Sequence, residues 1–240
     1  MPLVHTAAAL ILFFLAIPVI LIGLIISFGR LQSWLIENIG GAVGRTMLYF
    51  LKIRLQINDP YVKPNPVIYI INHSSTLDLF IILALKLKNV RYVAKYELLY
   101  NPLFFILGKA TGQIFIRRQN SEKAVKTLQK AYAPILKNGY SLLIAPEGTR
   151  NQTGSLAIFK KGAFRMAMDL KYDIVPIYIT GANRLCPGNS LRADSGTIKV
   201  DFGPPIDTRG WTTENLEANI EHIREEYIRR IKTSSPTNQD

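Results

Sequence analysis

The chain of 240 residues has little cysteine and little histidine: one cysteine, Cys186, and three histidines, His5, His73 and His222. A single cysteine excludes an internal disulfide and favours a reducing compartment. Because the histidines are far apart in the sequence, no spacing typical of zinc ligands exists, and we expect no bound metal. Neither a Gly-x-Gly-x-x-Gly nor a Walker A pattern occurs, which disfavours a nucleotide-binding enzyme.

Charged residues are absent from the N-terminus, since residues 1–29 contain no Lys, Arg, Asp or Glu. The stretch from Ala7 to Phe28 is 22 residues long, and a helix needs about 20 apolar residues to cross the hydrocarbon core of a bilayer. We predict that residues 1–29 form a membrane-inserted helical segment rather than a cleaved signal peptide, which would be shorter and would begin with basic residues. Pro18 and Gly23 leave both a single span and a re-entrant hairpin open, and a buried core helix is the alternative.

The residues after Phe28 are mostly basic. Between Phe28 and Asp59 there are four basic residues and one acid, Glu37. Because basic flanks stay on the cytoplasmic side of a membrane, we expect the rest of the chain on the cytoplasmic face, which is that of the inner membrane in a bacterium. Residues 30–60 are interpreted as an interfacial amphipathic segment and linker, with an amphipathic helix packed on the domain as the alternative.

Residues 61–240 alternate between short apolar runs and helical patterns, which predicts an α/β domain with a mixed sheet and helices on both of its faces. Strands are predicted at residues 67–71, 90–94, 113–116, 141–145, 174–179 and 197–202. Helices are predicted at residues 77–87, 122–136, 160–170 and 216–231. Pro176 lies inside the fifth of these strands and indicates an edge strand or a bulge, because proline cannot donate to a central ladder.

The net charge of +12 predicts an anionic partner. From Lys86 to Lys137 there are eleven Lys and Arg and two acids, which gives +9 of the +12. The apolar stretch "YNPLFFILG", residues 100–108, lies in the same region. Positive charge beside apolar side chains suits membrane lipids with anionic head groups. No nucleic-acid motif is present, so no nucleic-acid partner is expected, and a solvated basic face is the alternative.

The strand predicted at residues 67–71 is followed by Asn72 and His73, and Asp78 comes five residues after the histidine. In an α/β sheet, ligands bind beyond the carboxyl ends of the strands. Asp78, in the first turn of the next helix, can orient the imidazole of His73 and leave its other nitrogen available as a base. The nucleophile would then be a hydroxyl of the substrate. A structural histidine, with Asp78 serving the helix dipole, is the alternative.

Two further stretches place charged residues after predicted strands. In "GQIFIRR", Gly112 to Arg118, alternation sends the two arginines to opposite faces, so that one of them can bind an anion. In "APEGTR", Ala145 to Arg150, Gly148 permits a tight turn that carries a glutamate and an arginine. Each stretch is ambiguous when it is taken alone.

The combination is more specific than its parts. The motifs occur in the order Asn-His-x4-Asp, Gly-x-Ile-Phe-Ile-x-Arg, Pro-Glu-Gly-Thr-Arg and a Val-Pro strand. In this order the chain resembles the glycerolipid acyltransferase family over residues 60–205, and most closely the 1-acyl-glycerol-3-phosphate acyltransferases within it. The segment "FKKGAFRMA", residues 159–167, also looks like the one that follows the third motif in that family.

The resemblance implies an O-acyltransferase of phospholipid synthesis. His73, oriented by Asp78, would take the proton from the free sn-2 hydroxyl of 1-acyl-glycerol-3-phosphate as that hydroxyl attacks an acyl thioester, giving phosphatidic acid. The donor would be acyl-CoA or acyl carrier protein, and neither a cofactor nor a metal is implied. The motifs place phosphate binding on Arg118. They place acceptor binding on Glu147, Gly148, Thr149 and Arg150.

The chain departs from the family pattern at Ala145, where an aromatic residue is usual, at Asn151, where serine is usual, and at Arg117, where an acid is frequent. The added charge at Arg117 leaves another lysophospholipid acceptor open. From a different class, a lipid hydrolase is disfavoured because the nearest approach to Gly-x-Ser-x-Gly, "GNSLR", ends in arginine. A non-catalytic lipid-binding protein is the remaining alternative.

The resemblance generates a prediction for Arg118. Arg118→Ala should mainly raise the KM for the acceptor, by about tenfold or more, because a hydrogen bond to a charged group contributes about 1.5–3 kcal/mol. Steady-state kinetics with the acceptor and the donor varied separately would measure this. An effect confined to the acyl donor would show that the role is assigned to the wrong substrate.

Overall fold

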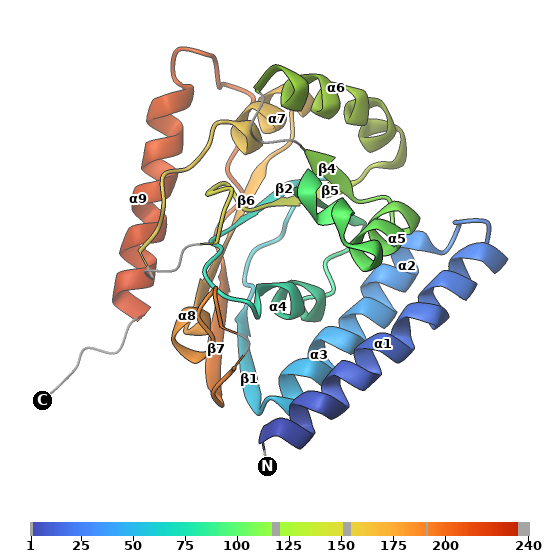
Figure 1. The fold of residues 1–240 in the computed structure, drawn as a ribbon. Coiled ribbons are helices and arrows are strands. Elements are labelled where there is room, and N and C mark those ends of the chain that lie inside the picture. The colour runs from blue at the N-terminus through green and yellow to red at the C-terminus, as the bar shows by residue number, and fades with distance from the viewer. Residues whose placement is uncertain (1, 117–120, 151–154, 191, 235–240) are drawn as a thin grey trace, which may run out of the picture. The chain divides into compact units, whose positions relative to one another are not determined.

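A computed structural model of the chain describes residues 2–116, 121–150, 155–190 and 192–234. The chain folds into two compact units (Figure 1). One is built from residues 1–53 and 77–142, and the other from residues 54–76 and 143–240. These units are defined by packing, so the predicted functional boundaries after residues 29 and 60 stay a prediction.

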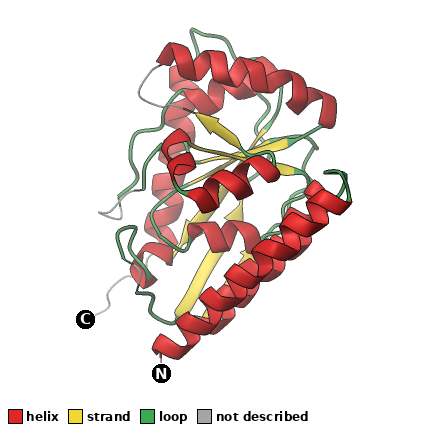
Figure 2. Ribbon diagram, turned by 45° about the vertical axis from the view of Figure 1, so that its right-hand side comes forward, coloured by secondary structure: helices red, strands yellow, loops and turns green. Residues whose placement is uncertain are grey.

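The first unit begins with two helical rods that lie side by side (Figures 1 and 2). The first rod is α1 (Pro2–Ile26), and the second combines α2 (Gln32–Leu35), a π-helical turn (Ile36–Gly40) and α3 (Gly41–Phe50). The chain reverses between them, where Phe28 and Gly29 have φ values of 50° and 75°. α3 packs on α4 (Asp78–Ala84) so closely that a Cβ at Gly44 would lie only 2.6 Å from the carbonyl oxygen of Phe80. Glycine at this position therefore permits the close approach of the two helices.

α1 contains most of the apolar stretch from Ala7 to Phe28, so the predicted helix is present. Among the helical residues whose side chains the structure describes, none of the helices has both the length and the apolar composition that a membrane span requires. The insertion of residues 1–29 into a membrane therefore stays a prediction.

The rest of the first unit alternates strands and helices. It contains β3 (Val90–Lys95), a 3₁₀ turn (Tyr96–Tyr100), α5 (Pro102–Ala110), β4 (Ile114–Ile116) and α6 (Ser121–Asn138). β3 and β4 are parallel. α5 begins with Pro102 in its first turn and with Asn101 as its cap, whose Oδ1 accepts from the N–H of Leu103 at 2.9 Å. β5 (Ser141–Ile144) begins in this unit and ends in the other.

A buried arginine ties the helices of the first unit to its strands. Arg91 on β3 is buried, and its Nη2 donates to Gln32 at 2.8 Å and to Ser33 at 3.2 Å, both on α2. Its guanidinium lies over the ring of Tyr140, 3.8 Å from the centroid. Burial lowers the pKa of Arg91 below its ordinary value, and electrostatic attraction to Tyr140 and Glu37 partly offsets this lowering. The arginine therefore fixes α2 against β3.

The second unit contains a mixed sheet. Its strands are β1 (Ile53–Asn58), β2 (Ile68–Ile71), β6 (Ile174–Thr180) and β7 (Gly196–Phe202), and they are hydrogen-bonded in the order β1-β7-β6-β2. β2 pairs with β6 in parallel, whereas β6 and β7 are antiparallel. The helices are α7 (Gly162–Leu170), α8 (Ala182–Leu185) and α9 (Leu216–Ser234). α9 packs beside β6 (Figure 1).

The prediction of an α/β fold with a mixed sheet is confirmed, and each of the six predicted strands is present with its ends within one residue. One strand was missed. Residues 53–58, which were predicted to lie in an interfacial segment, form β1 and pair with β7. The strand forms because Ile53, Leu55 and Ile57 alternate with polar residues, and this period of two is that of a half-buried strand.

The prediction that Pro176 marks an edge strand is wrong, because β6 lies between β7 and β2 and all seven of its residues are buried. The alternative prediction of a bulge agrees with the pairing, whose register shifts by one residue between the pair Ile177 with Phe202 and the isolated bridge of Ile174 with Ile206. Pro176 is tolerated because it falls one residue beyond the last β6–β7 pair, Ile177 with Phe202. No ladder bond to β7 therefore needs its missing N–H. Its carbonyl oxygen accepts from the N–H of Gly203 at 2.8 Å.

A tyrosine hydroxyl joins β2 and β6 beside this proline. Tyr227 on α9 is fully buried, and its hydroxyl donates to the carbonyl of Ile70 at 2.7 Å and accepts from the N–H of Ile177 at 3.1 Å. Burial raises the pKa of Tyr227 well above its ordinary value of 10.0, so the hydroxyl stays protonated. α9 is therefore anchored to the sheet by a hydrogen-bonded side chain as well as by its apolar face.

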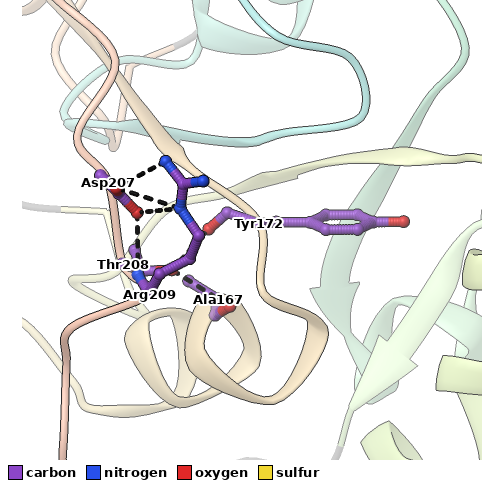
Figure 3. A network of polar contacts seen from close by, with 5 residues as sticks. All are labelled: Ala167, Tyr172, Asp207, Thr208 and Arg209. Carbon is purple, nitrogen blue, oxygen red and sulfur yellow. Dashed lines mark hydrogen bonds and ion pairs between the residues drawn. The ribbon is translucent and has the colours of Figure 1, made fainter.

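A second polar network closes the end of α7 (Figure 3). The hydroxyl of Thr208 donates to the carbonyls of Tyr172 at 2.9 Å and of Ala167 at 3.4 Å. Its neighbours Asp207 and Arg209 pair at the surface, and hydrogen bonds from Arg209 lower the pKa of Asp207 to about 2. The hydroxyl of Thr208 therefore joins the last turn of α7 to the chain that directly follows it.

Tyr227→Phe should lower the free energy of unfolding by about 1–3 kcal/mol, because the buried N–H of Ile177 and the carbonyl of Ile70 lose their shared partner. Urea unfolding of the purified protein would measure the loss. Tyr61→Phe, in the same unit at an exposed position, is the control and should change stability by no more than about 0.5 kcal/mol. Equal effects of the two changes would contradict the anchoring role of the hydroxyl.

Candidate active site

The segment 72–76 carries the chain out of β2 without regular secondary structure, and its first residue is held by the sheet. Asn72 is only 4% exposed. Its Nδ2 donates to the carbonyl of Ile179 at 2.8 Å, and its Oδ1 accepts from the N–H of the same residue at 2.8 Å. The carboxamide therefore continues the pairing of β2 with β6 after the last main-chain partners, Ile71 and Ile177. As a result, His73 leaves the sheet from a fixed point.

The hydroxyls that follow His73 hold the segment against the loop 186–190. Ser75 Oγ donates to the carbonyl of Cys186 at 2.6 Å, and Thr76 Oγ1 donates to that of Ser190 at 2.7 Å. Ser75 also forms an isolated antiparallel bridge with Pro187. The segment 72–76 is thus fixed on both sides of the histidine, whose side chain is half-buried.

The turn after β5 carries the motif "PEGTR". It is closed by a hydrogen bond from the N–H of Gly148 to the carbonyl of Ala145 at 3.1 Å. Gly148 has a φ of 78°, a left-handed conformation that favours glycine. A Cβ at this position would also lie 3.0 Å from Cε and Nζ of Lys160. Glycine is therefore favoured here by the backbone conformation, whereas the end of the flexible lysine side chain could move aside.

Glu147 connects this turn to the histidine. It is 3% exposed. Its Oε1 accepts from the backbone N–H of His73 at 2.7 Å, and its Oε2 accepts from the backbone N–H of Ala157 at 2.9 Å. One carboxylate thus joins three pieces of chain: the segment after β2, the turn after β5 and the loop that precedes α7.

Arg150 lies on the exposed side of the same turn. Its Nη1 donates to the carbonyl of Gly188 at 3.1 Å and reaches Thr76 Oγ1 at 3.4 Å. The guanidinium therefore sits beside the segment that carries His73. A half-buried imidazole and an exposed cation on one surface can combine proton transfer with anion binding.

The structure thus brings His73, Glu147, Gly148 and Arg150 together in the second unit, and Thr149 is exposed on the same turn. Asp78 is buried at the first residue of α4 and belongs to the first unit, since the boundary falls after Thr76. Its pairing with the imidazole of His73 stays a prediction. Arg117, Arg118 and Asn151 lie outside the described residues.

The sequence indicated that Asn72 lies next to the site, but it did not predict that the carboxamide extends the pairing of β2 with β6. The signal was a polar carboxamide at the end of a fully buried strand, where only a hydrogen-bonded side chain is tolerated. The contribution of the loop 186–190 had no such signal, because it acts through main-chain carbonyls. Among the described residues, no three His, Cys, Asp or Glu side chains are grouped so as to hold a metal ion.

Comparisons with known proteins all identify acyltransferases as similar to this chain. The family model described as Acyltransferase matches residues 52–180. A 1-acyl-sn-glycerol-3-phosphate acyltransferase from Cocos nucifera is 33% identical over 195 residues, which cover 81% of this chain and 63% of that protein. The enzyme of the same name from Haemophilus influenzae is 30% identical over 184 residues, which cover 77% of this chain and 76% of that protein. The chain therefore spans less than two thirds of the length of the coconut protein.

One solved structure is similar over its whole length. It is the crystal structure of the 1-acyl-sn-glycerophosphate (LPA) acyltransferase PlsC from Thermotoga maritima, with a TM-score of 0.76, 21% sequence identity and complete coverage of both chains. At this identity the likeness is one of fold.

Asn72→Ala should lower the free energy of unfolding by about 1–3 kcal/mol, because the buried N–H and carbonyl of Ile179 both lose their partners. Asn58→Ala is the matched control, since Asn58 makes an exposed hydrogen bond to Asp201 at 3.1 Å and should contribute about 1 kcal/mol or less. Chemical unfolding would compare the two variants. A smaller loss for Asn72 than for Asn58 would contradict the ladder-extending role.

Proposed function

The chain belongs to the acyltransferase family, and we propose that it transfers an acyl chain from a thioester donor to the free sn-2 hydroxyl of 1-acyl-glycerol-3-phosphate, giving phosphatidic acid. The observation that carries the proposal is the arrangement around His73. A half-buried imidazole lies on a segment pinned by Asn72, Ser75 and Thr76, with the "PEGTR" turn hydrogen-bonded against it. The names of the relatives support the choice of acceptor.

In the proposed reaction His73 is the general base. It takes the proton of the acceptor hydroxyl as the hydroxyl oxygen attacks the thioester carbonyl. The tetrahedral intermediate then expels the thiolate, which receives the proton back from the imidazolium. Asp78 is assigned the role of orienting the imidazole and stabilising its charge, as the acid of a triad does. The acyl group passes directly to the lipid, so neither an acyl-enzyme nor a cofactor is needed.

The acceptor phosphate is assigned to arginines. Arg150 is exposed beside Thr76, where its guanidinium fork suits an oxyanion. Arg118 is the second candidate, from the family motif. Gly148 and Thr149 lie in the same turn as Arg150 and would shape the acceptor site from the backbone. The donor is proposed to be acyl-CoA or acyl carrier protein.

The proposal places the protein at a membrane, with the catalytic residues on the cytoplasmic face. Support comes from the first unit, where large apolar side chains are exposed: Phe28 by 90%, Ile25 by 74% and Trp34 by 53%. Large apolar side chains that are exposed within a short stretch of chain suit a surface that binds lipid or another protein. Both the acceptor and the product are lipids, so contact with a bilayer would supply one substrate and receive the product.

His73→Ala should reduce acyl transfer by at least about 100-fold, because general base catalysis contributes about 10²–10⁴ in rate. The assay combines the purified protein with a panel of lysophospholipids and both thioester donors, and it follows labelled phospholipid. His222→Ala, at an exposed position on α9, is the control and should leave the rate unchanged.

Retention of near-normal turnover by folded His73→Ala would exclude the base mechanism. Labelling of wild type by a covalent serine probe, together with fatty acid release instead of transfer, would indicate the hydrolase alternative. Transfer to another lysophospholipid in preference to 1-acyl-glycerol-3-phosphate would correct the acceptor and keep the reaction.

A further inference from the structure

Glu147 differs from its neighbours in the "PEGTR" turn in how much of it a substrate can reach. Thr149 and Arg150 are exposed, whereas Glu147 is 3% exposed. A lipid head group binds through side chains that present polar atoms to it, and a carboxylate would also repel the phosphate of the acceptor. The burial of Glu147 therefore favours a role within the protein over direct contact with the acceptor.

The two oxygens of Glu147 are directed at main-chain donors. Oε1 accepts from the N–H of His73 at 2.7 Å, and Oε2 accepts from the N–H of Ala157 at 2.9 Å. Hydrogen bonds to an ionised acceptor are shorter and about twice as strong as neutral ones. They also compensate the cost of burying a charge, which is large for a carboxylate without partners.

The bond to His73 completes the restraint of the histidine backbone. Asn72 fixes the preceding residue to β6 through two hydrogen bonds. Glu147 then fixes the N–H of His73 itself, so the position from which the imidazole projects is set on one side by the sheet and on the other by the turn. Because a misplacement of about 1 Å can cost about 10²-fold in rate, this restraint bears directly on catalysis.

The second bond of Glu147 holds a loop that is also held from its other side. Arg224 on α9 donates from Nε to the carbonyl of Ala157 at 3.1 Å and from Nη2 to that of Leu156 at 3.4 Å. The loop at residues 156–157 thus has two independent anchors, Glu147 and Arg224. Only Glu147 also holds His73, and this difference separates the two roles experimentally.

We infer that Glu147 is a positioning residue, which acts on the reaction by fixing the backbone of His73 and does not bind the acceptor. The inference rests on the proposed function and replaces the acceptor-binding role that the family motif implies for this residue. Arg150 and Thr149 remain the members of the turn that meet the substrate.

Glu147→Met tests the inference, because methionine has a similar length and lacks the two acceptor oxygens. We expect kcat to fall by about 10- to 100-fold, while the KM for the acceptor changes by less than about threefold, since only the placement of the base is altered. Glu147→Gln keeps one oxygen and should give an intermediate kcat. If Glu147→Met does not fold, as judged by its thermal unfolding, Glu147→Gln carries the test with the same criterion.

Arg224→Met is the matched control, because it removes the other anchor of the loop and leaves the bond to His73. Its kcat should stay within about threefold of wild type. A rise in acceptor KM at unchanged kcat in either Glu147 variant would overturn the inference and return Glu147 to the acceptor site. An equal fall of kcat in Arg224→Met would also overturn it, because the effect would then come from the loop.

The experiments distinguish a failure of the proposed function from a failure of the positioning role of Glu147. If wild type transfers no acyl group to any lysophospholipid, the proposed function is wrong and the role of Glu147 is lost with it. If wild type is active and the Glu147 variants lose acceptor affinity alone, the proposed function stands and only the positioning role is wrong.

Discussion

The parallel pairing of β2 with β6 is the constraint on which the site depends. It sets where β2 ends, and His73 is the second residue after that end. A slip of one residue would turn Asn72 away from Ile179 and present the histidine to the opposite face, because side chains alternate along a strand. The register is fixed by how the buried side chains of both strands pack against their neighbours, and at the end of β2 by the two hydrogen bonds of the buried Asn72 to Ile179. The position of the candidate base is thus decided by packing in the core.

Polar side chains complete the hydrogen bonding of the main chain wherever the ladder stops. Tyr227 inserts its hydroxyl between β2 and β6, Asn72 adds a pair beyond the last main-chain partners, and Glu147 binds the next N–H along the chain. Each of these side chains is buried, so leaving its polar atoms without hydrogen-bond partners would be energetically costly. The hydrogen bonds that they make therefore favour this one arrangement of the chain. At the end of the sheet, the main-chain groups of Ile179 and the N–H of His73 are thus hydrogen-bonded to side chains instead of to a neighbouring strand.

The sequence predicted the regular elements well and the connections between them less well. The six predicted strands were found because their apolar runs are bounded by turn residues, and the last helix was found from its apolar face at Leu216, Ile220 and Tyr227. β1 was missed because it directly follows the apolar end of α3, although its period of two was visible. The central position of Pro176 could not be read locally, because it depends on where β7 ends. The contact of Glu147 with His73 joins residues 74 apart in the chain, and no local pattern encodes it.

The "PEGTR" turn gives neighbouring residues opposite tasks, and burial decides which task each has. Gly148 reverses the chain with a φ of 78°, so that Glu147 before it points into the protein while Thr149 and Arg150 after it face solvent. The negative charge is thereby used internally, where backbone N–H groups need an acceptor. The positive charge lies at the surface, where it could bind the anionic acceptor of the proposed reaction. If the two charges were exchanged, an arginine would be buried against N–H donors and a carboxylate would face the phosphate, and both arrangements are unfavourable. The order of glutamate before glycine and arginine after it therefore follows from the electrostatics of the turn.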